Sequence, residues 1–235
     1  MKHTFFIKDW LNSFLSLLFP HCCVVCGRPL AKGEECLCTM CNINLPRTNY
    51  HLRKDNPVER LFWGQIPLER ATSFFFYRKG SDFRQILHQL KYGGKKEVGI
   101  IMGRYMAAEL LDSGFFGGVD VIIPIPLHKK KQQIRGYNQS ECIARGISAV
   151  TGIAVCVESV VRRKNTETQT RKSVFERWEN VDGIFELNHA DSLTGKHILI
   201  VDDVLTTGAT TIACASRLAE VEGTRISVLT LAMAD

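Results

Sequence analysis

The chain has 235 residues, of which 45% are hydrophobic and 23% are charged, and its formal net charge is +6. This length and composition are typical of one globular domain with a small additional module, and they exclude a low-complexity or disordered chain. No uninterrupted apolar run approaches the roughly 18 residues that a membrane-spanning helix needs, so none is predicted.

Residues 1–19 are rich in apolar side chains but lack the pattern of a secretory signal. Lys8 and Asp9 interrupt the apolar run, and no small-residue cleavage site follows it. Apolar side chains between Phe6 and Leu18 recur at helical spacing, which predicts an amphipathic helix. This helix either packs against the next module or lies on a membrane surface. Without a secretory signal we expect a cytoplasmic protein, whose thiols stay reduced.

Residues 20–48 are predicted to form a small metal-binding module. Two Cys-x2-Cys pairs can present four thiolates to one ion, and these are Cys23, Cys26, Cys38 and Cys41. Four sulfur ligands favour Zn²⁺, with an iron–sulfur cluster as the alternative. The ion is expected to be structural, because so short a segment buries too little apolar surface to fold alone. Cys22 and Cys36 are left over, and Cys22 could replace Cys23.

Residues 49–70 are polar and read as a connector, in which Phe62 and Trp63 anchor the chain to the core or, alternatively, stack on a base. From residue 71 to residue 235, strand and helix patterns alternate. Strands are expected at 72–77, 119–125, 154–161, 198–201 and 225–231, and helices at 82–90, 99–111, from near Asn138, and at 211–220. This order predicts an α/β domain with a mostly parallel sheet and helices on both faces.

The most informative segment begins with the apolar run Ile198 to Val201, which is typical of a strand buried on both faces. Asp202 and Asp203 follow where this strand is expected to end. A loop comes next, consisting of Val204, Leu205, Thr206, Thr207, Gly208, Ala209 and Thr210.

The loop's backbone N–H groups and the start of the following helix would suit a phosphate group. The two carboxylates could accept hydrogen bonds from a sugar diol or hold Mg²⁺. The combination predicts a site for a phosphorylated ribose, and the alternative is an ordinary acidic turn after a buried strand.

A second group of charged residues follows the strand predicted at 119–125. Between His128 and Ser140 there are four cations and no acid, in what we expect to be a loop before a helix. At the carboxyl end of a second strand, this loop is a candidate pyrophosphate site, with Lys129, Arg135 and Gly136 as the contacts. The alternative is a solvated basic loop.

Two further segments carry functional expectations. Residues 162–181 are polar, without clear periodicity, and are expected to form a lid that keeps water from the reacting sugar. Lys91 adds a positive charge after the first helix of the main domain, and the sequence assigns it no role.

Several motifs of this chain resemble those of a known family. The run from Ile198 to Thr211 is similar to the phosphoribosyl-pyrophosphate (PRPP) motif of type I phosphoribosyltransferases. The chain also carries the two Cys-x2-Cys pairs, Leu90-Lys91-Tyr92, Pro124-Ile125-Pro126-Leu127 and Arg135-Gly136-Tyr137-Asn138-Gln139. Together with the run from Ile198 to Thr211, these motifs resemble those of the competence protein F (ComF) family.

The resemblance implies a zinc-ribbon module joined to a type I phosphoribosyltransferase domain. It implies that Asp202 and Asp203 contact the ribose hydroxyls and Mg²⁺, and that residues 204–210 surround the 5′-phosphate. It also implies a link to natural transformation, in which family members handle incoming single-stranded DNA.

Two functions follow as hypotheses. The first is an enzyme that transfers phosphoribose from PRPP to an unknown acceptor. The second is a binding protein for single-stranded DNA or PRPP, acting with DNA-uptake proteins and without turnover. A zinc-dependent transcription factor is disfavoured, because no recognition helix follows the cysteine pairs.

Overall fold

A computed structural model describes residues 21–163 and 183–235. The predicted helix within residues 1–19 and all but the first two residues of the predicted lid lie outside this range. Within it, no helix is long and apolar enough to cross a membrane.

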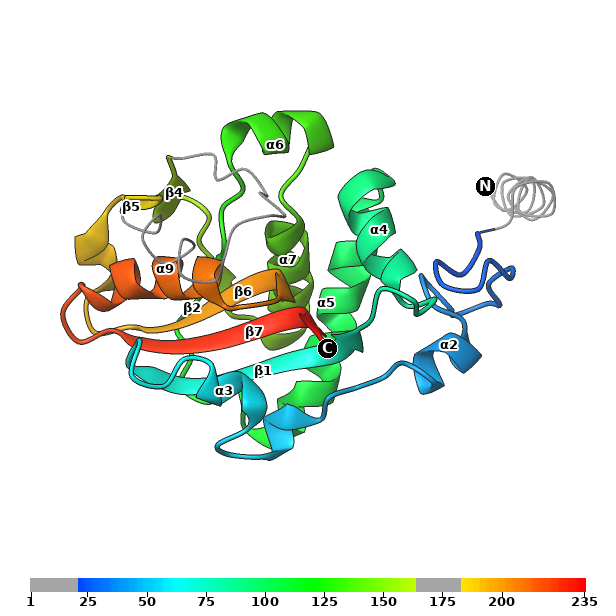
Figure 1. Cartoon of the computed structure of the whole chain (residues 1–235), viewed down its shortest axis with the longest axis horizontal. Coiled ribbons are helices and arrows are strands. Elements are labelled where there is room, and N and C mark those ends of the chain that lie inside the picture. Colours follow the sequence, from blue (N-terminus) through cyan, green and yellow to red (C-terminus); the bar gives the residue numbers. More distant parts are fainter. Residues whose placement is uncertain (1–20, 164–182) are drawn as a thin grey trace, which may run out of the picture.

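A five-stranded parallel sheet with the order β1-β7-β6-β2-β3 organises the chain (Figure 1). Its strands are β1 (Leu68–Tyr77), β2 (Val121–Pro124), β3 (Ala154–Val155), β6 (His197–Leu205) and β7 (Arg225–Ala234). A separate antiparallel pair consists of β4 (Val160–Arg162) and β5 (Phe185–Leu187). The predicted parallel sheet is therefore confirmed.

Helices cover both faces of this sheet, as expected (Figure 1). The α-helices are α2 (Thr39–Ile43), α3 (Pro57–Arg60), α4 (Arg84–Tyr92), α5 (Lys96–Leu110), α6 (Lys129–Arg135), α7 (Gln139–Thr151) and α9 (Ala209–Ala219). The described residues also form the short 3₁₀ helices η1 (Tyr50–Leu52), η2 (Leu111–Ser113) and η3 (Ala190–Leu193).

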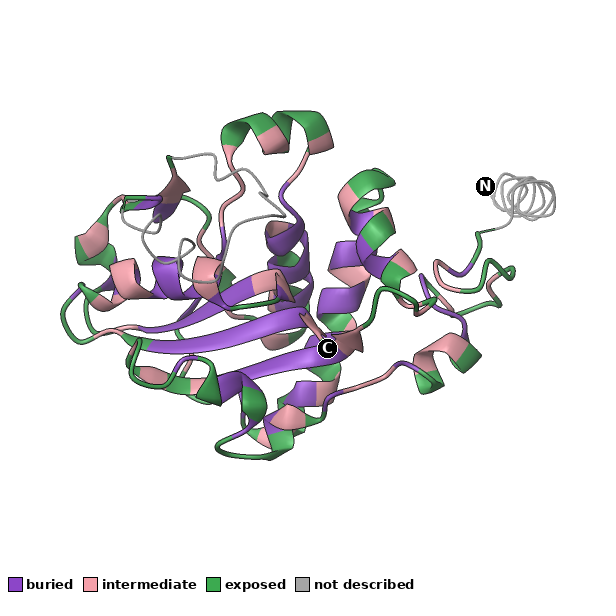
Figure 2. Cartoon of the chain, in the orientation of Figure 1, coloured by how far each residue is buried: buried purple, intermediate pink, exposed green. Residues whose placement is uncertain are grey.

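The core is divided by the sheet into two layers. Along β6, Leu199 and Val201 join the cluster that includes α4, α5 and α7, whereas Ile198 and Ile200 join the cluster beneath α9 and α3. This alternation is the two-residue period of a strand, and both sides are apolar because both are covered. The central strands are accordingly buried throughout most of their length (Figure 2).

Close contact between α5 and α7 depends on two glycines. A Cβ atom on Gly103 would lie 2.2 Å from the backbone oxygen of Ile143, and one on Gly146 would lie 2.0 Å from that of Ile100. Both distances are far below van der Waals contact, so only glycine permits this approach of the two helices.

The cysteine-rich segment packs against the main domain and shares its core. Cys36 and Leu37 are buried in the same cluster as Met102 of α5, and the Cys36 Sγ lies 3.9 Å from the Met102 Sδ. At the surface, Arg104 Nη1 lies 2.8 Å from Glu35 Oε1. The segment is thereby held on α5, at one end of the molecule (Figure 1).

The segment at residues 49–70 contains η1 and α3 and the first residues of β1. Asn56 and Glu59 form a capping box at the start of α3, which the sequence Asn-Pro-Val-Glu encodes locally. Phe62 is fully buried, which confirms its predicted anchoring role. The same prediction is wrong for Trp63, which is 55% exposed and lies under the Arg60 guanidinium.

The predicted strand at 154–161 is wrong as a single element. β3 ends at Val155, the chain turns, and β4 begins at Val160 in the other sheet. Within the turn, the Cys156 Sγ and Ser159 Oγ lie 2.8 Å apart. The residues before and after the turn belong to strands of two different sheets. The hydrophobic pattern is therefore continuous along the sequence, although the strand is not.

The remaining differences concern helix boundaries and one loop. The helix expected at 82–90 begins at Arg84, and Ser81 accepts a hydrogen bond from the Phe83 N–H in the preceding turn rather than capping the helix itself. The basic loop expected after residue 128 is the helix α6. Its Lys, Gln and Arg residues are good helix formers, the His128 side chain caps its start, and Gly136 ends it at a φ of 78°.

Candidate functional site

The two predicted acidic residues lie inside β6 rather than after it. The expected strand end at Val201 marks where pairing with β2 stops, at Pro124, whereas pairing with β7 continues as far as Leu205. Because β7 extends to Ala234, it keeps β6 extended beyond the point where β2 turns away. Asp202 and Asp203 therefore lie just past the carboxyl end of β2, where ligands bind in open α/β sheets.

Asp202 is held by two hydrogen bonds. The Ser140 hydroxyl donates to its Oδ1 at 2.9 Å, and the Asp203 backbone N–H donates to the same oxygen at 2.8 Å. Burial, together with the neighbouring Asp203 charge, nevertheless raises the pKa of Asp202 to about 7. The sequence did not identify Ser140, although its position in the first turn of α7, beside the carboxyl end of β2, is where a contact to the site would be sought.

Asp203 has a different partner. Its Oδ2 lies 3.0 Å from the Lys91 Nζ, and the two side chains are only 14% and 23% exposed. Lys91 lies in the last turn of α4, where the Tyr137 hydroxyl donates to the backbone oxygen of Leu90 at 2.7 Å. The fold thus brings to the acidic pair a lysine for which sequence analysis gave no function.

A second cation approaches from the other sheet. Burial lowers the pKa of Arg162 on β4, and the charge of the nearby Asp202 opposes this shift. The Arg162 guanidinium also lies over the Phe185 ring, 5.6 Å from the ring centre, in a cation–π contact. The acidic pair is therefore positioned among cations from two separate elements.

The predicted phosphate loop is shorter than expected. Val204 and Leu205 belong to β6, and Ala209 and Thr210 are the first residues of α9, so that Thr206, Thr207 and Gly208 form the turn between them. Thr206 and Thr207 are exposed, and Gly208 precedes α9 at a φ of 77°.

This turn has the features of an anion site. Gly208 is the N-cap of α9 and carries no side chain that could satisfy the helix's first N–H groups. These groups, with the Thr206 and Thr207 hydroxyls, are available to an anion at the positive end of the helix dipole. Two residues separate the turn from the acidic pair.

The three residues predicted to bind pyrophosphate occupy different parts of α6 and its end. The Arg135 guanidinium lies 5.5 Å from the centre of the Tyr92 ring and donates to the Gln139 Oε1 at 2.7 Å. Gly136 ends α6, and Lys129 is exposed at the helix's first turn. Arg135 therefore contacts the residue next to Lys91, whereas Lys129 lies at the opposite end of α6.

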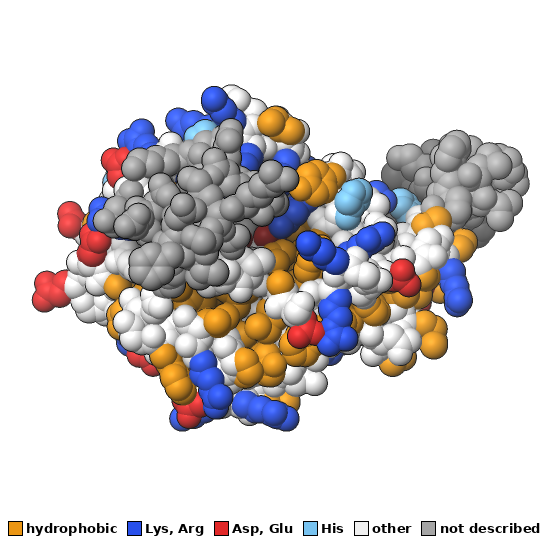
Figure 3. Space-filling view, in the orientation of Figure 1, with side chains coloured by type: hydrophobic (Ala, Val, Ile, Leu, Met, Phe, Trp, Pro, Cys, Tyr) orange, Lys and Arg blue, Asp and Glu red, His pale blue; other side chains and the backbone are white. Residues whose placement is uncertain are grey.

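The surface over α6 carries several lysine and arginine side chains (Figure 3). This agrees with the expected basic surface, although a helix rather than a loop presents it.

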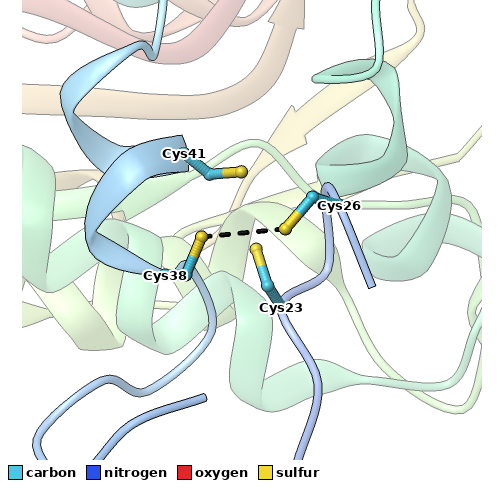
Figure 4. Close-up of side chains that lie close together, drawn as sticks. All are labelled: Cys23, Cys26, Cys38 and Cys41. Carbon is cyan, nitrogen blue, oxygen red and sulfur yellow. Dashed lines mark hydrogen bonds between the residues drawn. The ribbon is translucent and has the colours of Figure 1, made fainter. Parts of the chain in front are cut away.

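The four predicted metal ligands converge on one point (Figure 4). The Sγ atoms of Cys23, Cys26, Cys38 and Cys41 all lie within 4.8 Å of one another. Cys22 is exposed outside this group, and Cys36 is buried against Met102, so the alternative in which Cys22 replaces Cys23 is wrong.

The arrangement fits a single tetrahedral ion. A Zn–S distance of about 2.3 Å implies sulfurs about 3.8 Å apart, and the Cys26 and Cys38 Sγ atoms are 3.7 Å apart. Burial opposes ionisation of Cys23, but backbone N–H donors from Cys26, Cys38 and Val25 outweigh it and lower the pKa of Cys23 to about 7. Four converging sulfurs with such donors could hold Zn²⁺. They lie too close together for a cluster in which each thiolate binds a different iron.

Comparison with known proteins is consistent with this geometry. A family model described as "Phosphoribosyl transferase domain" matches residues 138–234, a range that includes Ser140, the acidic pair and the turn before α9. Lys91 and the cysteine group lie outside it.

Relatives with known names extend the match to most of the chain. A "DNA utilization protein YhgH" of Shigella flexneri is 30% identical over 217 residues, covering 86% of this chain and 92% of the relative. "Competence protein ComFC" of Bacillus subtilis is 25% identical over 199 residues, or 85% and 72% of the two chains. "Competence protein F" of Haemophilus influenzae is 35% identical over 92 residues, or 39% and 40%.

Proposed function

Because this chain belongs to the competence protein F (ComF) family and has a phosphoribosyltransferase-type domain, we propose that it binds PRPP with Mg²⁺ and transfers its phosphoribose group to an acceptor. One observation carries the proposal. Two carboxylates in β6, just past the carboxyl end of the neighbouring β2, are followed after two intervening residues by a turn and a helix N-terminus suited to a phosphate.

In this proposal Asp202 and Asp203 accept hydrogen bonds from the ribose 2′ and 3′ hydroxyls. The turn formed by Thr206, Thr207 and Gly208 donates to the 5′-phosphate. As the bond between C1′ and the pyrophosphate oxygen breaks, its electron pair leaves with pyrophosphate and positive charge develops on the ribose ring. The two carboxylates would stabilise that charge before the acceptor forms the new bond at C1′.

The donor set is compatible with Mg²⁺ that is bound together with its substrate. Among the described residues, the four cysteines are the one arrangement of three or more His, Cys, Asp or Glu side chains that could hold a metal. The acidic pair alone offers two carboxylates, and Mg²⁺ usually takes its other oxygen ligands from substrate phosphates and water. When bound, Mg²⁺ would neutralise charge on the departing pyrophosphate.

The cysteine group is proposed to hold a structural Zn²⁺. All four ligand positions of a tetrahedral ion would be filled by sulfur, which leaves no open position for a substrate. The ion would stabilise the segment that packs on α5.

A binding role in DNA uptake without turnover is the second candidate. The exposed Lys129 and Lys130 at the start of α6 favour it, because they lie at the opposite end of the helix from Arg135 and could face a nucleic acid backbone. Binding of this kind should weaken steeply as salt rises from about 50 to 200 mM.

Calorimetric titration with PRPP and Mg²⁺ tests the first candidate. Asp203→Asn should weaken PRPP binding at least tenfold, because charge-assisted hydrogen bonds contribute on the order of 1.5–3 kcal/mol each. Asp191→Asn, an exposed carboxylate in η3, is the matched control and should bind as the wild type does. Unchanged affinity in Asp203→Asn would remove the assignment. Pyrophosphate release with candidate acceptor bases then separates an enzyme from a binding protein.

A further inference from the structure

Lys91 forms the one direct ion pair with the acidic residues that the described part of the chain shows. We infer that Lys91 is a leaving-group-binding residue: its ammonium pairs with Asp203 and changes partner to the pyrophosphate group when PRPP binds. This inference rests on the proposed function, and it assigns to α4 a part of the site that lies outside the region matched as a phosphoribosyltransferase domain.

The backbone that carries Lys91 is firmly held. Leu90 is fully buried in the core. Its backbone oxygen accepts a hydrogen bond from the hydroxyl of Tyr137, which lies just before α7. The lysine side chain, by contrast, keeps 23% of its surface exposed and has a flexible four-carbon stem. Its ammonium can therefore move while α4 stays in place.

Ligand binding would weaken the ion pair between Lys91 and Asp203. The Lys91 ammonium compensates the charge of Asp203 at a distance of 3.0 Å. A ribose hydroxyl, and a cation bound with the substrate, compete for the same carboxylate. A cation there would also repel an ammonium 3.0 Å from Asp203, so the pair opens when the site fills.

The nearest new partner is the pyrophosphate group. It is attached to C1′, next to the carbon whose hydroxyl the acidic pair accepts from, so an ammonium released from Asp203 lies on the correct side of the ribose. The adjacent Tyr92 holds the Arg135 guanidinium at 5.5 Å from its ring centre, which adds a second positive charge on this side. Lys91 and Arg135 would together face the leaving group.

Two ligands that differ only in the leaving group provide the test. Calorimetry with PRPP and with ribose 5-phosphate, each with Mg²⁺, measures how much of the affinity depends on pyrophosphate. In Lys91→Gln, PRPP affinity should fall at least about tenfold, as expected for loss of a charge-assisted contact. Ribose 5-phosphate should bind at least as tightly as to the wild type, because its competitor for Asp203 is gone.

Two variants complete the design. Lys91→Arg retains the positive charge and should keep most of the preference for PRPP, and it also keeps the pair with Asp203 if Lys91→Gln folds poorly. Lys79→Gln removes an exposed lysine beyond the opposite end of α4 and should leave both affinities unchanged.

The outcomes are distinguishable. Equal weakening of both ligands in Lys91→Gln would make Lys91 a purely structural partner of Asp203 and overturn the inference. Unchanged affinity for both ligands would overturn it as well. A wild-type protein that binds neither ligand would overturn the proposed function and this inference with it, whereas the first two results would leave the proposed function intact.

Discussion

Replacing Asp202 by Asn should stabilise the protein while weakening its ligand binding. The amide oxygen of Asn can accept the same hydrogen bonds from Ser140 and from the backbone N–H of Asp203 that the carboxylate accepts now. What the substitution removes is a buried charge beside another carboxylate. The pKa of Asp202 is raised from 3.8 to about 7 by that burial and by Asp203.

The size of the effect follows from the pKa. Raising it from 3.8 to about 7 corresponds to roughly 4 kcal/mol at most, because a tenfold change in an equilibrium is about 1.4 kcal/mol. Solvent that still reaches the half-buried side chain screens part of this cost, so we expect Asp202→Asn to gain about 2–3 kcal/mol in free energy of unfolding at pH 8.

The gain should depend on pH with a definite sign. Below pH 3.8 Asp202 is protonated in both the folded and the unfolded chain, and the variant has no advantage. Between pH 3.8 and about 7 the unfolded chain loses this proton and the folded protein keeps it, so wild-type stability falls relative to the variant. Above about pH 7 the difference is constant.

Urea unfolding followed by circular dichroism at several pH values measures this difference. Asp203→Asn is the comparison in the same site: it relieves the repulsion between the two carboxylates but also breaks the ion pair with Lys91, so it should gain less stability than Asp202→Asn. Both variants should bind PRPP more weakly. An Asp202→Asn variant that is less stable than the wild type at pH 8, or whose advantage does not change with pH, would refute the argument from burial.

Two further predictions concern the cysteine group and the helix contact. Cys38→Ser should reduce bound zinc, measured by elemental analysis, from about one ion per chain to nearly none, because a tetrahedral site loses one of its four ligands. Cys22→Ser should retain the ion, and loss of zinc in that variant would contradict the ligand set. Gly146→Ala should destabilise the protein by at least about 3 kcal/mol in urea unfolding, since its Cβ would lie 2.0 Å from the Ile100 oxygen. Gly80→Ala, where a Cβ meets nothing within 4 Å, should change stability by less than about 0.5 kcal/mol, and equal effects of both would contradict the packing argument.

Much of the fold was readable from local patterns. The parallel sheet follows from alternating apolar strands and helices, and the buried β6 follows from its apolar run. The cysteine group was also predictable, because two residues between paired cysteines fix the geometry that presents both sulfurs to one point. In each case, the residues that define the feature are neighbours in the sequence.

Other predictions were wrong where strand pairing with distant parts of the chain decides the structure of a segment. The run from Ala154 to Val161 is continuous in hydrophobicity, but its two ends pair with different sheets. β6 continues past Val201 only because β7 pairs with it as far as Leu205. Neither partner can be recognised from the segment's own composition.

The sequence alone determined the chemistry of the site: an acidic pair, a glycine-containing turn, and four cysteines at metal-binding spacing. Only the tertiary structure decided which side chains face that pair. Lys91 reaches Asp203, and Ser140 reaches Asp202, because α4 and α7 pack on one face of the sheet near the carboxyl ends of its strands. A local pattern specifies which groups a segment carries, but packing of the whole core specifies which groups meet, since that depends on contacts between residues far apart in the chain.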